Sequence, residues 1–196
     1  MRLAKLTMGA LAVMLGTWIW TAALWGQSRA MDVNHSVLKI RVFKSGFFSA
    51  FAHNHEIEAP ITQGVVNLSA SPSIELRVDA RRLRVLDPEL SADKRAEVQR
   101  TMDGPAVLDS NRFPEIVFQS TSVEKIGADH WTVRGNLTLH GQTRPVIVDV
   151  ALRDGRYEGS ATLKQRGFGI TPVSIAGGTV KVKDEVKVEF GIALLQ

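Results

Sequence analysis

Apolar and polar residues alternate along most of this chain after residue 36, and this repeat of two constrains the fold more than any other feature. In the first run, Leu38, Ile40 and Val42 are separated by Lys39 and Arg41. Similar runs occupy residues 74–78, 116–118, 133–139, 146–150 and 186–190. Successive side chains of a β-strand point to opposite faces. The alternation therefore predicts strands with one apolar and one wet face, as in antiparallel sheets.

Residues that favour tight turns separate these runs. Hairpin connections are expected at Gly127-Ala128-Asp129, Gly141-Gln142, Asp154-Gly155 and Lys183-Asp184-Glu185. Roughly eight to ten strands fit between residues 31 and 196 at the spacing that is typical of a sandwich or barrel. We find no linker or internal repeat, so residues 31–196 are predicted to form one all-β domain.

One segment departs from the repeat of two and predicts a helix. Ser91 is a suitable N-cap for it, and Gly104-Pro105 would end it. A second helical turn is expected at residues 106–109, so the domain would carry one or two short helices. The acidic residues around the first helix, Asp87, Asp93 and Glu97, are expected to be solvated.

The first thirty residues differ in character from the rest. Arg2 and Lys5 are followed by an uncharged run over residues 6–28, which predicts a secretory signal peptide cleaved before Met31. The same run is long enough for an uncleaved membrane anchor helix. Both interpretations export residues 31–196, which predicts a periplasmic protein, attached to the inner membrane if the run is retained.

Composition excludes several classes of function. The chain has no cysteine, which excludes a disulfide scaffold, a thiolate metal site and a cysteine nucleophile. Its net charge of +4 falls to +1 without residues 1–30, which hold three basic and no acidic residues. Nucleic-acid binding is therefore not expected. The sequence carries no G-x-S-x-G, H-E-x-x-H or Walker A motif, so no catalytic residues are assigned.

Several motifs occur in an order that resembles one known family. Asp32-Val33-Asn34-His35-Ser36 precedes the first strand, RFPEIVFQS spans residues 112–120, and GNLTLHGQTRPV spans residues 135–146. FGI at residues 168–170 and VKVEFGI at residues 186–192 follow. Over residues 32–192 the chain resembles the YceI-like family of periplasmic lipid-binding proteins. The resemblance implies an extended, lipocalin-like antiparallel barrel of about eight strands. It also implies a channel that holds a polyisoprenoid or an isoprenoid quinone.

That resemblance, together with the apolar parity of each strand, assigns candidate lipid-binding residues. The wall of the channel would be formed by Ile40, Val42, Phe118, Val133, Leu137, Leu139, Val148 and Phe168. Phe47, Phe48 and Phe51 would line its mouth, or would instead plug one end of the core. The expected partner is a long-chain apolar lipid, and a homodimer is left open.

The segment His53-Asn54-His55 allows three interpretations. Residues two apart in a strand face the same way, so both histidines could contact a lipid head group or bind one metal ion, with His140 as a third ligand. They could equally be an ordinary hydrogen-bonded pair. The main hypothesis is a noncatalytic lipid carrier or scavenger. The alternatives are a metal-binding protein or metal-dependent enzyme, and a ligand-free structural or stress protein.

Overall fold

The fold is described from a computed structural model, which describes residues 28–45, 54–175 and 180–195. Most of these residues lie in strands, as the alternation predicts. The strands are β1 (Ser28–Ala30), β2 (Val37–Ser45), β3 (His55–Glu58), β4 (Ile61–Asn67), β5 (Ser73–Asp79), β6 (Arg84–Val85), β7 (Glu115–Gly127), β8 (His130–Leu139), β9 (Gln142–Arg153), β10 (Arg156–Lys164), β11 (Ser174–Ile175) and β12 (Val180–Ile192). The helices are α1 (Ala92–Asp103) and two 3-10 turns, η2 (Ala80–Arg82) and η3 (Gln165–Phe168).

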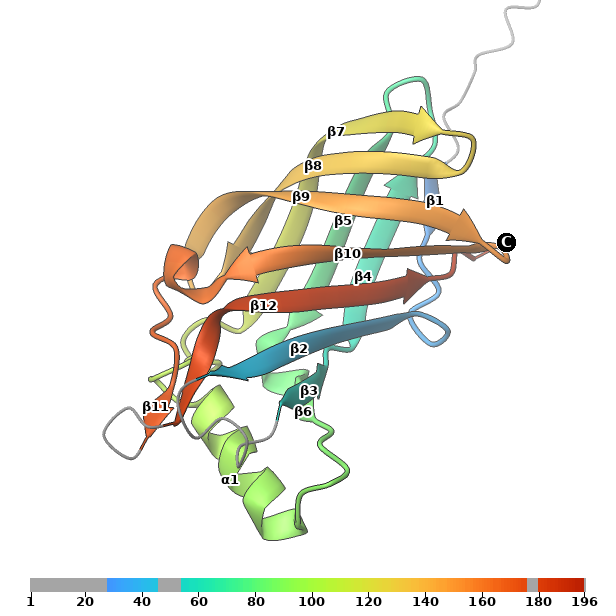
Figure 1. The fold of residues 1–196 in the computed structure, drawn as a ribbon. Coiled ribbons are helices and arrows are strands. Elements are labelled where there is room, and N and C mark those ends of the chain that lie inside the picture. The colour runs from blue at the N-terminus through green and yellow to red at the C-terminus, as the bar shows by residue number, and fades with distance from the viewer. Residues whose placement is uncertain (1–27, 46–53, 176–179, 196) are drawn as a thin grey trace, which may run out of the picture.

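The strands form one strongly curled antiparallel sheet, a half-barrel (Figure 1). Its order is β1-β4-β5-β7-β8-β9-β10-β12-β2-β3-β6, and β11 pairs only with β12. The all-β antiparallel prediction is confirmed, whereas the prediction of a barrel of about eight strands is wrong in size. Eight strands have seven residues or more. The alternating runs correspond to β2, β5, β7, β8, β9 and β12. They do not reveal β4 and β10, nor the short strands β1, β3, β6 and β11, in which two to four residues carry too little of the repeat.

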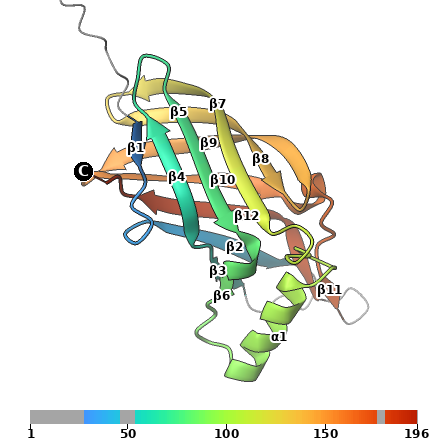
Figure 2. The ribbon, with the colours of Figure 1, turned by 180° about the vertical axis from the view of Figure 1, so that it is seen from behind.

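The two chain ends of the described domain pair with each other. Met31 forms an isolated antiparallel bridge with Leu194, and the amide of Leu195 donates to the carbonyl of Ala30 at 2.9 Å. The amide of Met31 also donates to Gly64 of β4. Residues 30–32 therefore join the end of β12 to β4 on the far side of the curled sheet (Figure 2).

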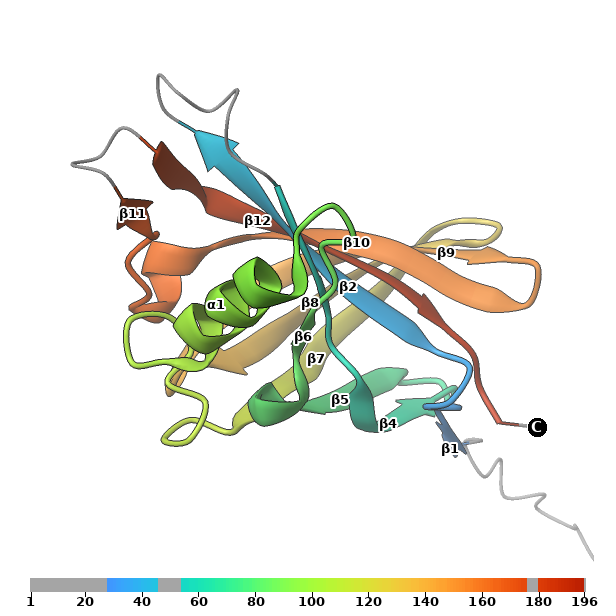
Figure 3. The ribbon, with the colours of Figure 1, turned by 90° about the horizontal axis from the view of Figure 1, so that it is seen from below.

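The helix forms where the sequence predicts it. The Ser91 hydroxyl accepts from the amide of Lys94, and α1 ends at Gly104. Gln99 ties α1 to β6, because its side chain accepts from the amide of Val85 and donates to the carbonyl of Leu83. Residues 105–108 form a turn rather than the expected second helix. Seen from below, α1 lies across one end of the half-barrel, which we call the helix end (Figure 3).

The opposite end carries the connections β1–β2, β4–β5, β7–β8 and β9–β10, together with Leu195, and we call it the turn end. Two of these connections, β7–β8 and β9–β10, lie where the sequence predicts hairpin turns. A third predicted turn, Gly141-Gln142, connects β8 to β9 at the other end of the sheet. The predicted fourth hairpin at residues 183–185 is wrong, because these residues continue β12 through a β-bulge between Val182 and Val186. No helix among the described residues is long and apolar enough to cross a membrane.

Apolar side chains line the concave side of the sheet in two clusters. The helix-end cluster contains eleven buried residues, among them Ile57, Leu163 and Phe168. The turn-end cluster contains only three, Met31, Ile61 and Ile192. Half-buried Leu38 and Leu76 pack against both clusters, so apolar contact is continuous from one end to the other.

Candidate functional site

Strand register places most of the predicted channel residues on one face. Directly paired residues of neighbouring strands share a face, and Val42 pairs with Val186, Ile40 with Val188, Phe118 with Leu137, and Val133 with Val148. Ile40, Val42, Leu137 and Leu139 are half-buried against the helix-end cluster, whose buried members include Phe168. Val133 is 2% exposed, whereas Phe118 and Val148 are half-buried.

Glycines on this inner face make room for large side chains to lie flat along the wall. A Cβ atom on Gly135 would meet the Phe118 ring at 2.5 Å, and one on Gly159 would meet the Phe190 ring at 2.6 Å. Gly64 is covered by the Met31 side chain in the same way. Each large side chain thus occupies space over a neighbouring strand instead of extending across the concavity.

Four predicted site residues, Phe47, Phe48, Phe51 and His53, lie outside the described residues. The predicted signal or anchor segment also lies outside them, apart from its last three residues, which form β1.

His55, in contrast, has a defined position at the helix end. It is the first residue of β3 and pairs with Val42, so its imidazole shares the inner face with the apolar wall. Its Nδ1 lies 2.6 Å from Oδ2 of Asp87, whose side chain is only 3% exposed. The other Asp87 oxygen accepts from the amide of Glu56 at 2.8 Å. Two donors therefore satisfy a carboxylate that has lost almost all contact with water.

The burial of Asp87 corrects the expectation that this residue is solvated. It lies between β6 and α1, and its backbone carbonyl also accepts from Arg95 at 3.3 Å. No local pattern indicates this role, because His55 is 32 residues away and meets Asp87 only when β3 and β6 pair. A carboxylate at Nδ1 fixes the orientation of the ring and leaves Nε2 as its second polar atom.

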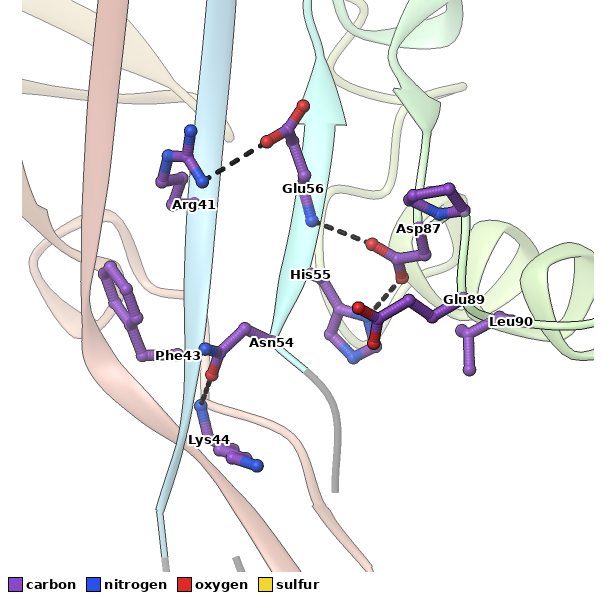
Figure 4. Close-up of a pocket in the computed structure, with 10 residues that line it drawn as sticks. Arg41, Phe43, Lys44, Asn54, His55, Glu56, Asp87, Glu89 and Leu90 are labelled. Carbon is purple, nitrogen blue, oxygen red and sulfur yellow. Dashed lines mark hydrogen bonds and ion pairs between the residues drawn. The ribbon is translucent and has the colours of Figure 1, made fainter. Parts of the chain in front are cut away.

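An open hollow of about 320 Å³ lies beside this pair (Figure 4). Phe43 and Leu90 contribute apolar surface, and Asn54 accepts from the amide of Lys44 at 3.1 Å. Among the residues that line it, the acidic ones outnumber lysine and arginine by three to two. The lining residues are Arg41, Phe43, Lys44, Asn54, His55, Glu56, Asp87, Pro88, Glu89 and Leu90. The hollow therefore suits an uncharged polar group better than an anion.

On the wet face of the neighbouring strands, Arg41 joins β2 to β12 and β3. It lies 2.6 Å from Glu189 and 3.3 Å from Glu56. Hydrogen bonds from Lys187 and Arg41 lower the pKa of Glu189, and the bond to Glu189 raises the pKa of Arg41. These pairs fix the register of the strands that carry His55.

His140 has a structural position. It lies in the β8–β9 turn with φ of 50°, its Nδ1 lies 3.1 Å from the carbonyl of Phe168, and its ring packs edge-on against Phe113. Among residues 28–45, 54–175 and 180–195, no three His, Asp or Glu side chains gather as a metal site.

Comparison with known proteins gives a consistent match. Residues 30–194 match the sequence model of the YceI-like domain. A UPF0312 protein of Pseudomonas aeruginosa is 30% identical over 184 residues, covering 85% of this chain and 87% of the relative. A UPF0312 protein of Vibrio cholerae is 25% identical, covering 79% and 81%.

Solved structures match the fold at lower identity. BcnA of Burkholderia cenocepacia aligns with a TM-score of 0.62 and 18% identity, covering 85% of this chain and 99% of that one. A domain of Saccharophagus degradans, described as a polyisoprenoid binding domain implicated in plant cell wall breakdown, aligns with a TM-score of 0.54 and 14% identity, covering 85% and 97%.

Proposed function

The chain belongs to the YceI-like family, and from this membership and the apolar inner face we propose that it binds a long apolar lipid, a polyisoprenoid or an isoprenoid quinone. The protein is proposed to act as a noncatalytic carrier or scavenger in the periplasm. The similar fold of a domain that is described as polyisoprenoid-binding supports this choice of ligand class.

One observation carries the proposal: apolar contact on the concave face is continuous between the two ends of the half-barrel. Leu38 and Leu76 connect the helix-end and turn-end clusters, and Phe118 and Phe190 lie flat over glycines. An extended hydrocarbon suits such a long apolar wall. Binding would gain about 25 cal/mol for each Å² of apolar surface removed from water, so a chain that buries about 400 Å² would gain about 10 kcal/mol before the entropic cost of binding.

The His55–Asp87 pair is proposed to contact the polar end of the lipid. Because Nδ1 of His55 donates to Asp87, Nε2 of the neutral ring would accept a hydrogen bond from a hydroxyl group, and it would donate one to a carbonyl only with both ring nitrogens protonated. Because three acidic residues and only two lysine or arginine residues line the hollow, an uncharged prenol or quinone head group is expected to bind better than a prenyl phosphate.

Native mass spectrometry of the full chain tests the proposal. After incubation with a long-chain prenol or with ubiquinone, we expect one lipid per chain. Retention of the unliganded mass with both lipids would contradict the proposal and favour a ligand-free structural protein.

Two adjacent residues of β9 provide a matched pair of variants. Val148 faces the inner wall, whereas Ile147 is 53% exposed on the other face. Val148→Glu is expected to abolish lipid uptake, and Ile147→Glu is expected to retain it. Loss of uptake in both variants, or in neither, would argue against binding along this wall.

A further inference from the structure

Exposed apolar side chains are concentrated at the turn end. Of the six large apolar side chains that are well exposed in the described part of the chain, five belong to this end: Val33, Val37, Leu68, Ile126 and Leu195. Ile126 is 62% exposed. The sixth is Ile147, in the middle of β9. Single exposed apolar residues are ordinary, but five on neighbouring turns indicate a surface that contacts something apolar.

Hydrogen bonds and strand pairing bring the segments that carry these residues together. Ser28 pairs with Asn67, which places β1 beside the turn that begins at Leu68. Arg156 donates to the carbonyl of His35 at 2.6 Å, which joins the β9–β10 turn to the β1–β2 connection. The amide of Leu152 donates to the carbonyl of Asp129 at 2.9 Å, which joins the β7–β8 turn to β9. The turns thus form one rim, which Figure 1 shows on the side of the C-terminus.

Charge at this rim is mixed. Lys125 and Arg153 are basic, whereas Asp129 and Asp154 are acidic, and all four are exposed. Such a surface has no strong preference for an acidic or a basic partner. Apolar contact would therefore dominate any association that it makes.

The segment that precedes Ser28 in the chain indicates which partner lies next to this rim. Ser28, the first described residue, lies at the turn end, so residues 1–27 join the domain here. Residues 6–27 carry no charge. An uncharged run of this length, led by Arg2 and Lys5, enters or crosses a bilayer during export. A retained run would therefore hold the turn end next to the bilayer.

We propose that the turn end docks on a lipid bilayer, with Leu68 and Ile126 inserted among the head groups. The α1 end then points away from the membrane. This orientation does not depend on a ligand, so it stands or falls independently of the proposed lipid binding. Because charge at the rim is mixed, neutral phosphatidylcholine vesicles are expected to suffice.

The absence of cysteine allows a precise test on the full chain. Ile126→Cys and Ile147→Cys each introduce a single thiol at an exposed isoleucine, one at the turn end and one in the middle of the sheet. Each is labelled with an environment-sensitive fluorophore and mixed with phosphatidylcholine vesicles, with and without doxyl-labelled lipid.

We expect the label on Ile126→Cys to shift to the blue and to be quenched by doxyl lipid, while the label on Ile147→Cys is unchanged. Adding Leu68→Ser to Ile126→Cys should weaken the quenching about tenfold at limiting lipid, because the exposed aliphatic surface is reduced. Equal behaviour of the two labels would overturn the proposal. So would a label on Ile126→Cys that is already shielded without vesicles, since another part of the chain or a second copy would then cover the rim.

Discussion

The two ends of the half-barrel each carry an aspartate–histidine pair of nearly equal length. At the turn end, Nδ1 of His35 lies 2.7 Å from Asp32, with side-chain exposures of 75% and 21%. At the helix end, the corresponding distance from His55 to Asp87 is 2.6 Å, with exposures of 24% and 3%. The same two residue types thus form a surface contact at one end and a buried polar centre at the other.

The difference follows from what surrounds each aspartate. Asp32 also accepts from the amides of Asn34 and His35, so it shapes a turn. The bond to the His35 ring is the largest cause of the lowered pKa of Asp32. Asp87 instead links three elements. Its side chain forms hydrogen bonds with two residues of β3, and its position in the chain lies between β6 and α1. Burial, rather than the length of the hydrogen bond, therefore decides which pair matters for the fold.

The largest expected difference between the two ends is in how much a truncated side chain of each apolar cluster lowers the free energy of unfolding. Phe168→Ala is expected to lower the free energy of unfolding by about 4 kcal/mol, because removal of its 3% exposed ring leaves a cavity among the ten other buried residues of the cluster. Met31→Ala, in the three-residue cluster, is expected to cost about 2 kcal/mol. Urea unfolding of the full chain followed by circular dichroism measures both, and a larger loss for Met31→Ala would reverse the comparison.

The aspartates themselves provide the next test. Asp87→Ala leaves the His55 ring and the Glu56 amide without their acceptor, and is expected to cost about 3 kcal/mol. Asp32→Ala is expected to cost clearly less, because water can replace the carboxylate. Equal unfolding midpoints for the two variants in urea would show that burial of Asp87 contributes nothing.

A smaller effect is expected on lipid binding. His55→Phe removes Nε2 but keeps a ring, and should weaken binding of a long-chain prenol about tenfold, which corresponds to about 1.4 kcal/mol. His35→Phe, at the other end, should leave binding unchanged. Titrations followed by native mass spectrometry compare the two, and an unchanged affinity for His55→Phe would remove the head-group assignment.

The smallest expected effect is on the loss of stability at acidic pH. Contacts with His35, Arg81 and Lys187 lower the pKa values of Asp32, Asp79 and Glu189 respectively. Their stabilising contributions are complete above the ordinary values of 3.8 for aspartate and 4.5 for glutamate, and are lost as the pH falls through the lowered values. Urea midpoints measured from about pH 6 to about pH 3 should fall less steeply in Asp32→Asn. An unchanged slope would show that the His35 contact is not formed in solution.

Local patterns predicted much of this fold. Alternation identified the inner face correctly, since Leu38, Ile40 and Val42 contact the buried clusters. Asp154-Gly155 forms a two-residue hairpin turn in which both residues have positive φ, which this dipeptide favours. Ser91 caps the helix as expected. Each of these features depends on residues that are close together in the sequence.

Features that depend on distant contacts were not predictable. Residues 183–185 resemble a turn, yet they lie in β12. There the Asp184 carboxylate accepts from the amide of Arg166, and the backbone carbonyl of Lys183 accepts from the side chain of Gln165. Residues 165–168 form a 3-10 turn that ends at Gly169, and the alternation does not indicate it. The His55–Asp87 pair belongs to the same group, because tertiary packing alone removes Asp87 from water.

The pairing of β2 with β12 has a consequence for how the protein is made. Arg41 and Glu189, which meet across these strands, are 148 residues apart. One long edge of β2 therefore has no partner until β12 has been synthesised. Folding of such a sheet is slow, and the waiting edge is open to pairing with other chains. In a chain that stops before residue 180, the edges of β2 and β10 that normally pair with β12 would stay unpaired. The sheet is therefore completed only when β12 inserts between these two strands.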